Sequence, residues 1–349
     1  MADRRFGLSA VAALTLCAGC SFAPPYHPPV TATPVTFKEV GPWTVANPQD
    51  QAPRSDWWAL YGDGTLDALE QRIEQANPTL AQALARYDEA HAYFLQAHAG
   101  LFPQVGLETD ITDNRQSNHR PLRGGGQPDL YPADSFGGVV SYELDLWGRV
   151  RNSIAAGKAE AQASADDVGA VKLSLESQLA NAYIALRGFD QQIELLSATV
   201  DAYGKADAMT QRRFNGGIAS GIETGQSGAQ LAEAQAQLAD ARSQRAIEEH
   251  AIASLVGTIA SSFSIAPADS DLTVPAVPME LPSTLLERRP DVAAAERHIA
   301  AANAEIGVAK AAFFPSISLG GQGGFQNTGL PTLFTAPNIF WSVGPSTVL

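Results

Sequence analysis

Cysteine and positive charge are both scarce in this sequence. Cys17 and Cys20 are the only cysteines among 349 residues, and both lie near the N-terminus. Lysine and arginine number 23 against 37 aspartates and glutamates, and the resulting net charge of −14 argues against a nucleic-acid partner. Charged residues of either sign make up only 17%. That composition suits long helices packed on one another more than it suits a compact enzyme.

The sequence also lacks the arrangements that enzymes and metal sites need. No nucleophile elbow, phosphate-binding loop or zinc-ligand spacing is present. The histidines are scattered, without cysteine or acidic ligands at metal-binding spacing, at positions 27, 91, 98, 119, 250 and 298. The glycine run at 124–126 has neither the strand-to-helix context nor the lysine of a phosphate loop. We therefore expect no enzymatic activity, no cofactor and no bound metal.

Long hydrophobic runs are missing as well, and the apolar stretch at the N-terminus predicts a secretory signal. Arg4 and Arg5 precede an apolar run over residues 6–16, which is too short to span a bilayer. The small residues and Cys20 that follow resemble a bacterial lipobox, so we expect removal of residues 1–19 and lipid on Cys20. A plain signal peptide with incidental cysteines is the alternative. With a lipobox, the mature chain has no free thiol and no disulfide.

A repeated pattern organises most of the remaining chain. An alanine-rich helix pattern, then Phe-Pro, then an alternating strand pattern occurs at residues 77–107 and again at 281–319. Pro78 and Pro103 in the first copy correspond to Pro290 and Pro315 in the second, at one constant offset and without a gap. A repeat of this length is too long for a solenoid. It predicts a duplicated half-molecule.

The order of the segments predicts the domain limits. Residues 20–56 are rich in proline and predict an extended N-terminal tether. We expect a first repeat at 57–262, a linker at 263–282 and a second repeat at 283–349. Trp57 and Trp58 predict a buried aromatic anchor where the first repeat begins. Within that repeat the patterns predict a short helix at 66–75, a helix at 78–101, strands at 103–111 and 136–146 with a polar loop at 114–132 between them, and two long helices.

The predicted strands have one apolar and one polar face. Val105, Leu107 and Ile111 alternate with polar neighbours, and the second strand alternates in the same way. Strands of this kind suit a transmembrane β-barrel, with Phe102 and Trp147 at one membrane interface. A soluble, half-buried hairpin is the alternative.

Four acidic residues belong to the polar faces and are candidates for the lining of a pore: Glu108, Asp110, Glu143 and Asp145. A negatively charged pore lining of this kind would favour cations over anions. For Glu143 and Asp145 we give equal weight to a structural alternative, in which they bind neighbouring loops at the base of the strands.

A helical pattern then runs from residue 148 to residue 215. Its apolar positions between 175 and 203 are spaced alternately by four and three, which predicts coiled-coil packing. Gly216 and Gly217 predict a tight reversal, and Ser220 is a candidate cap for a returning helix at 223–257. Gly225 and Gly228, each destabilising by about 1 kcal/mol relative to alanine, predict a loose start for that helix.

Together these patterns resemble the outer-membrane efflux proteins, the TolC-like exit ducts of tripartite pumps, and most closely their NodT-type lipoprotein branch. The resemblance covers nearly the whole chain. It rests on the lipobox-like Cys20, on WW at 57–58 with YGD at 61–63, on YELDLWGR at 142–149, on residues 214–220 and 251–257, and on LLERRPD at 285–291 through AAFFP at 311–315.

The resemblance implies a mainly α fold with transmembrane β structure, in which long coiled-coil hairpins accompany strands that contribute to a trimeric outer-membrane β-barrel. It also implies a homotrimer in outer-membrane lipid that extends into the periplasm, with a periplasmic adaptor (membrane fusion) protein and an inner-membrane pump as partners. The function would be a passive exit duct for small molecules or drugs. The hairpin tip resembles the family's adaptor-contact surface, through Arg213, Phe214, Gly216, Gly217, Ile218, Ala219 and Ser220.

Compared with the first copy, the second repeat lacks most of its second strand and its long hairpin, so we expect an incomplete chain. In the family the acidic gate residues lie in that hairpin, and none is assigned here. Two other functions stay open at this point: a lipid-anchored periplasmic coiled-coil scaffold, and a non-functional truncated remnant of an efflux duct.

Overall fold

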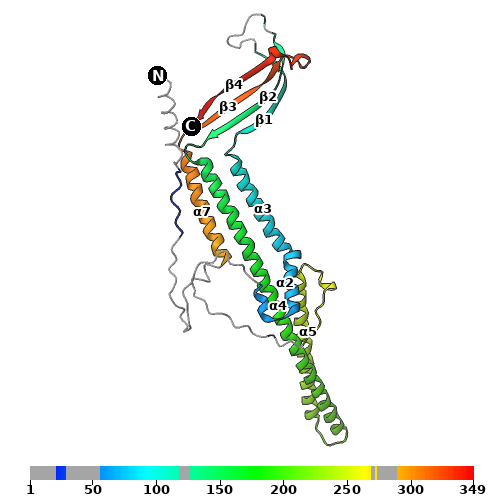
Figure 1. Ribbon diagram of the computed structural model, residues 1–349. Coiled ribbons are helices and arrows are strands. Elements are labelled where there is room, and N and C mark those ends of the chain that lie inside the picture. Colours follow the sequence, from blue (N-terminus) through cyan, green and yellow to red (C-terminus); the bar gives the residue numbers. More distant parts are fainter. Residues whose placement is uncertain (1–20, 29–55, 118–125, 127, 269–271, 273–288) are drawn as a thin grey trace. The chain divides into compact units, whose positions relative to one another are not determined.

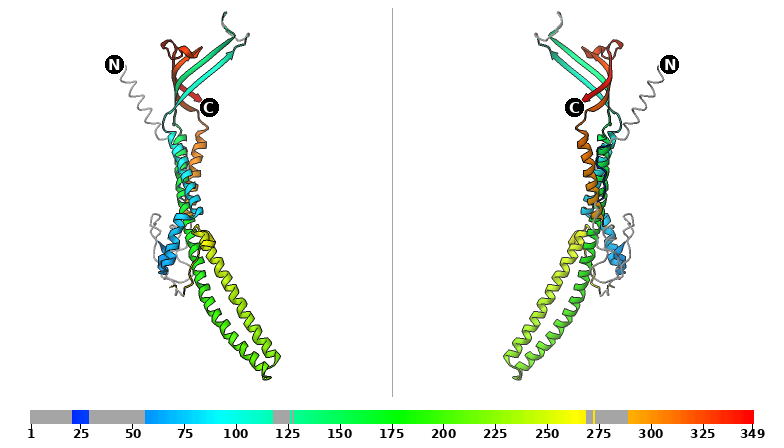
Figure 2. Two further views of the ribbon diagram at one scale, coloured as in Figure 1. Left: turned by 90° about the vertical axis from the view of Figure 1, so that its right-hand side faces the viewer. Right: turned by 90° about the vertical axis from the view of Figure 1, so that its left-hand side faces the viewer.

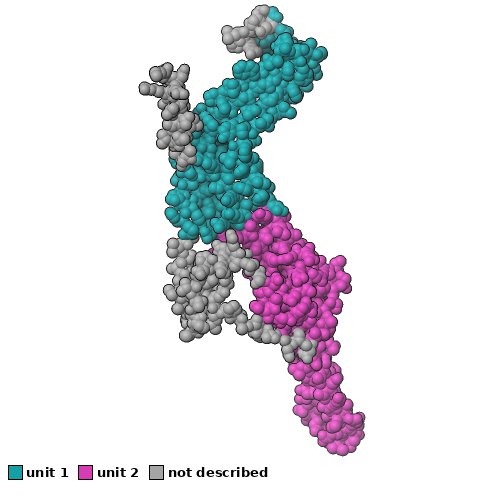
Figure 3. Space-filling model, in the orientation of Figure 1, with its two compact units in different colours: residues 1–30, 88–163, 295–349 teal, residues 31–87, 164–294 magenta. Residues whose placement is uncertain are grey.

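The computed structural model describes residues 21–28, 56–117, 126, 128–268, 272 and 289–349; the expected signal segment 1–19 and Cys20 lie outside these ranges. The chain divides into two compact units (Figure 3). Unit 1 comprises residues 1–30, 88–163 and 295–349, and unit 2 comprises residues 31–87 and 164–294. Three helices contribute residues to both units: α3 (Pro78–Ala99), α4 (Arg149–Asn215) and α7 (Pro290–Ala311).

Unit 1 contains an antiparallel sheet in the order β1-β2-β3-β4 (Figure 1). The strands are β1 (Gln104–Arg115), β2 (Leu130–Leu144), β3 (Ser316–Asn327) and β4 (Ile339–Val348). The sequence repeat accounts for this order, because each copy supplies one hairpin and the pairing of β2 with β3 joins the two hairpins. β1 and β4 therefore form the two edges of the sheet. Short 3-10 helices, η4 (Leu330–Thr332) and η5 (Ala336–Asn338), lie between β3 and β4.

The second strand differs in its limits from the prediction. β2 begins at Leu130 rather than at residue 136, because Leu130 still pairs with Arg115 and Pro132 with Asp113. These residues do not alternate between apolar and polar, so the side-chain pattern could not reveal a strand that backbone hydrogen bonds define. At its other end β2 stops at Leu144. The carboxylate of Asp145 instead accepts hydrogen bonds from two backbone N–H groups of α4.

The helices of unit 1 pack through small residues. An alanine-rich helix presents little side-chain bulk, so its neighbours can approach closely. A Cβ atom added to Gly157 of α4 would lie 3.2 Å from the Cα of Phe94 of α3. The buried alanines of this unit lie on α4 and α7, at positions 156, 159, 161, 163, 301, 304 and 311.

Unit 2 contains the main hydrophobic core. The helix α2 (Gly64–Ala76) begins after Asp63, whose carboxylate accepts hydrogen bonds from the backbone N–H groups of Thr65 and Leu66 at 2.8 and 3.1 Å. The preceding 3-10 helix η2 (Trp57–Tyr61) buries Trp58, as predicted for an aromatic anchor. The core is formed by Trp58, Leu66, Leu69, Ile73, Leu80, Leu175, Leu179, Ala180, Ala182, Tyr183, Leu186, Ile252, Val256 and Ile265. A short 3-10 helix, η3 (Ala260–Ser262), follows the helix α5 (Gly221–Leu255).

A long helical hairpin forms the rest of unit 2. The helix α5 (Gly221–Leu255) returns beside α4, as both views in Figure 2 show. Gly217 has φ of 74°, and Ser220 caps α5 in a capping box with Glu223, so the predicted reversal and cap are confirmed. α5 begins at Gly221, before the predicted residue 223, and the capping box satisfies the backbone N–H groups of Ser220 and Glu223. No helix among the described residues combines the length and apolar character needed to cross a bilayer.

Candidate functional site

The strand register gives the sheet one polar and one apolar face. Residues directly opposite each other in an antiparallel pair point to the same side, so the pairs Glu108 with Gly137 and Gly137 with Gly324 extend one face across three strands. Glycine, serine and glutamine dominate this polar face. The opposite face carries Val105, Leu107, Ile111, Phe136, Val140, Leu144, Ile317, Leu319, Trp341 and Val343.

The apolar face is uncovered in the single chain. Leu107 is 81% exposed, Trp341 75% and Val343 68%. An apolar surface of this extent on one side of a sheet marks a contact with lipid or protein.

Two of the four predicted pore-lining residues lie on the polar face without a partner in the described chain. Glu108 lies opposite Gly137 and Asp110 opposite Ser135. Both side chains are exposed. Because neither strand neighbour is charged, the two carboxylates add a local negative charge to this face.

The other two predicted pore-lining residues are engaged at the start of α4. The carboxylate of Glu143 accepts a hydrogen bond from Nε of Arg149 at 2.7 Å. The carboxylate of Asp145 accepts hydrogen bonds from the backbone N–H groups of Val150 and Arg151, and from Nε of Arg151 at 3.0 Å. A carboxylate at a helix N-terminus is favoured by the helix dipole. These contacts favour the structural alternative for Glu143 and Asp145.

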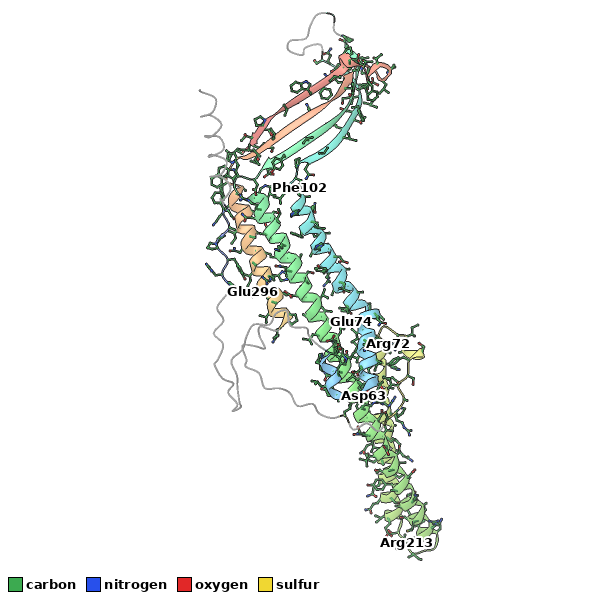
Figure 4. The ribbon with its side chains drawn as sticks, viewed as in Figure 1. Asp63, Arg72, Glu74, Phe102, Arg213 and Glu296 are labelled. Carbon is green, nitrogen blue, oxygen red and sulfur yellow. The ribbon has the colours of Figure 1, made fainter. Side chains whose placement is uncertain are left out.

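Aromatic residues lie at both ends of the strands. Phe102 precedes β1 (Figure 4) and Trp147 follows β2. The Phe102 side chain is 58% exposed. Nε1 of Trp147 donates to the carbonyl of Pro315 at 2.9 Å, which ties the end of β2 to the start of β3. At the opposite end, the ring of Phe334 makes edge-to-face contacts with Phe136 and Phe325. Two aromatic groups thus bracket the apolar face.

The hairpin tip brings the predicted contact residues together. The N–H groups of Ile218 and Ala219 both donate to the carbonyl of Arg213, and Gly217 N–H donates to that of Phe214. This tight turn leaves Ile218 72% exposed and Phe214 44% exposed, and Figure 4 marks its position by Arg213. Sequence reasoning missed Ile222, which is 73% exposed on the first turn of α5.

An ionic cluster in unit 2 was not predicted from the sequence. Asp190 lies between Arg187 and Arg245, with oxygen-to-nitrogen distances of 3.0 and 2.6 Å. Arg245 also contacts Glu249 at 3.4 Å, and Arg187 donates to the hydroxyl of Tyr183. Arg187 and Asp190 are three residues apart, and Arg245 and Glu249 are four apart, so the sequence shows that each pair can meet on one helix. The sequence does not show that Asp190 of α4 contacts Arg245 of α5.

A buried carboxyl group was also missed. Glu70 on α2 is 1% exposed, and its two carboxylate oxygens have no hydrogen-bond partner among the described residues. Burial, together with the nearby Glu176, raises the pKa of Glu70 to about 8. The Glu176 carboxylate accepts a hydrogen bond from Nε1 of Trp57, and burial raises its pKa as well.

No group of three potential metal ligands occurs in the part of the chain that the structure describes. His298, one of the scattered histidines, contacts Glu160 with its Nδ1 3.0 Å from a carboxylate oxygen. Both side chains are about half exposed, as expected for solvated helix positions.

Comparison with known proteins places these features in one family. The sequence matches the outer membrane efflux protein family over residues 69–258 and 281–349, which is more than half of the chain. It is 29% identical over 350 residues to the outer membrane protein OprJ of Pseudomonas aeruginosa, covering 99% of this chain and 71% of OprJ. It is also 29% identical over 342 residues to the probable efflux pump outer membrane protein TtgC of Pseudomonas putida, covering 97% of this chain and 70% of TtgC.

The fold is similar to that of the outer-membrane channel OprN, with a TM-score of 0.80 and 27% identity over 94% of this chain and 73% of OprN. The long helices and the four antiparallel strands thus match those of a solved outer-membrane channel. The chain belongs to the outer membrane efflux protein family and is an outer-membrane channel component of an efflux pump, not an enzyme.

Proposed function

We propose that the chain acts as the passive exit duct of a tripartite efflux system, as a homotrimer in the outer membrane. The observation that carries this proposal is the two-faced sheet with open edges. β1 and β4 each lack a second neighbouring strand within the described chain. Open edges are not tolerated in lipid, because their N–H and C=O groups stay unpaired, and four strands are too few to enclose a channel. Three copies, with β4 of each beside β1 of the next, would remove every edge.

We further propose that the chain belongs to the lipoprotein branch and is anchored through an acyl group on Cys20. The lipobox-like sequence before Ser21 supports this assignment. Since lipid attached at one residue anchors weakly, the sheet would supply the second attachment to the same membrane.

The partners in this proposal are a periplasmic adaptor and an inner-membrane pump that supplies the energy. The exposed apolar residues of the hairpin tip, Phe214, Ile218 and Ile222, support an adaptor contact there, because apolar side chains clustered at an exposed turn favour burial against a partner. Membership of the outer membrane efflux protein family argues against the alternative of a scaffold that never enters the membrane.

Neutralising the acidic residues of the polar face is expected to weaken cation preference. The double variant Glu108→Gln/Asp110→Asn, in an assembled channel recorded in a planar lipid bilayer under a salt gradient, should lower the cation-to-anion permeability ratio at least about twofold. The reason is that fixed negative charges in a narrow, low-dielectric passage concentrate cations.

The matched control is Asp113→Asn, because Asp113 lies on the same strand but on the opposite face. It should leave the reversal potential unchanged. If the double variant kept the wild-type reversal potential, Glu108 and Asp110 would not line the pore. An equal shift of the reversal potential in Asp113→Asn would contradict their role in the same way.

A charge at the hairpin tip is expected to disrupt adaptor binding. Gly217→Asp should reduce site-specific crosslinking to the adaptor about tenfold, because it places a carboxylate within an apolar contact. Gly217 adopts φ of 74°, a conformation that asparagine and aspartate tolerate better than other side chains. Gly217→Asn therefore controls for the backbone, and Gln235→Asp on the exposed face of α5 controls for charge. Normal crosslinking of Gly217→Asp would contradict the proposed contact.

A further inference from the structure

Glu70 is a buried titratable group that the proposed exit duct does not use. It lies on the face of α2 that contacts the core of unit 2, one helical turn from the buried Leu66 on one side and from the buried Ile73 on the other. Neither of its carboxyl oxygens has a hydrogen-bond partner among the described residues. An ionised carboxylate is far more costly to bury in this way than a neutral carboxylic acid. The docked position of α2 therefore requires a proton on Glu70.

The charges around α2 oppose the ionised form of Glu70. Glu176 of α4, which is also buried, acts on Glu70 as a like charge. Lys172 forms an ion pair with Glu74 and lies 3.8 Å from Glu176, so it neutralises other carboxylates. The charged and titratable groups around α2 are Asp56, Asp63, Asp67, Arg72 and Glu74 on its own side, and Lys172, Glu176, Tyr183 and Arg187 on α4 (Figure 4).

The C-terminal end of α2 is connected to two other helices. Asn77, which is buried, donates from Nδ2 to the carbonyl of Leu255 at the end of α5 at 2.7 Å. Its Oδ1 accepts hydrogen bonds from two backbone N–H groups in the first turn of α3, at 2.8 and 3.1 Å. A Cβ atom added to Gly257 would lie 2.3 Å from the carbonyl oxygen of Ala76. A displacement of α2 therefore disturbs the end of α5 and the start of α3.

We propose that the proton on Glu70 is a latch that holds η2 and α2 on α4, and that loss of this proton releases residues 57–77 from the core as one unit. The release loosens the end of α5 and the start of α3, through the contacts of Asn77 and Ala76. Unit 2 thus contains a pH-sensitive switch that acid closes. Every group in it belongs to one chain, so the inference does not depend on the proposed trimer or on its partners.

The direction and the range of the switch follow from the two protonation equilibria of Glu70. In the released segment Glu70 is solvated and ionises near pH 4–5, as an ordinary carboxyl does. In the docked segment, burial and Glu176 raise its pKa to about 8. Release between these values gives up a proton, so the equilibrium constant for release rises about tenfold per pH unit and levels off above about pH 8.

Hydrogen exchange of the full chain at pH 6 and pH 8, expressed as protection relative to an unstructured chain at the same pH, measures the release. Protection of residues 57–76 should fall at least about tenfold in the wild type. It should fall less than about threefold in Glu70→Gln, whose side chain is neutral at both pH values. Residues 252–258 should lose protection together with α2, whereas the hairpin residues 205–225 should keep theirs. Glu194→Gln, at an exposed position of α4, is the matched control and should behave as the wild type.

Equal protection of residues 57–76 at pH 6 and pH 8 in the wild type would overturn the latch, and so would an equal fall in Glu70→Gln. Release as a unit also requires α2 to exchange faster than residues 175–186 of α4 at pH 8. Equal protection of these two segments would show that Glu70 loses its proton only when the whole of unit 2 unfolds. If Glu70→Gln does not fold, Glu176→Gln replaces it: without the like charge the fall in protection should be at least about twofold smaller, and an unchanged fall would contradict the proposal.

Discussion

Replacing Asp190 with alanine is expected to lower the free energy of unfolding of unit 2 by roughly 3–5 kcal/mol, because removing one partner of a buried ion pair leaves uncompensated charge. The Asp190 side chain is 4% exposed, between the guanidinium groups of Arg187 and Arg245. These arginines also donate to the carbonyls of Ala266 and Ile265, respectively. The variant should therefore also loosen the chain that follows η3.

Thermal unfolding of the detergent-solubilised protein, together with limited proteolysis near residues 263–268, measures both effects. Asp201→Ala is the matched control, since Asp201 is exposed on the same helix, and its effect should stay within about 0.5 kcal/mol. Replacing Arg187, Asp190 and Arg245 together with apolar residues of similar volume should recover much of the loss. If Asp190→Ala unfolds at the same temperature as Asp201→Ala, the cluster contributes nothing to stability.

Replacing Glu70 with glutamine is expected to stabilise the protein at pH 8 and to flatten its dependence on pH. The pKa of Glu70, raised to about 8 by burial and by Glu176, means that the folded chain keeps a proton which the unfolded chain loses near pH 4–5. Between these values the unfolded state binds fewer protons, so wild-type stability falls as pH rises and levels off above about pH 8.

The expected size is roughly 2–5 kcal/mol between pH 5 and pH 8, since a tenfold change in proton affinity corresponds to about 1.4 kcal/mol. Tm measured from pH 5 to pH 9 should therefore fall in the wild type and fall much less in Glu70→Gln, in which the raised pKa of Glu176 remains. Glu194→Gln, at an exposed position of α4, should follow the wild-type curve. A Glu70→Gln curve parallel to the wild type would mean that Glu70 does not titrate in this range.

The sequence predicted the elements closely wherever a periodic pattern reports burial. α4 and α5 follow from the helical spacing and from the glycines and serine at their turn, and β3 follows from its likeness to β1 in the repeat. Prediction failed at the start of β2, where backbone pairing continues without an apolar face. It also placed the start of α5 two residues late, because Ser220 caps the helix directly before Gly221.

The candidate sites divide in the same way. Glu108 and Asp110 could be placed on one face because strand side chains alternate. The tip residues could be placed because the turn at the end of a helical hairpin is exposed. Glu143 and Asp145 share the polar pattern, but what they bind depends on how the chain turns into α4. Their partners, Arg149 and Arg151, became apparent only in the folded structure.

By itself the sequence determined the fold class and the family of the protein. Each copy of the repeat, the two-faced strands, the long hairpin and the family motifs can be recognised from residues that are near each other in the sequence. Only the tertiary structure decided which polar groups are buried and what they meet. Asp190 and Arg245 are 55 residues apart and Ser21 and Asn152 are 131 apart. Periodicity records which face of an element is covered. It carries no information about the partner, because that depends on how distant elements align when the core forms.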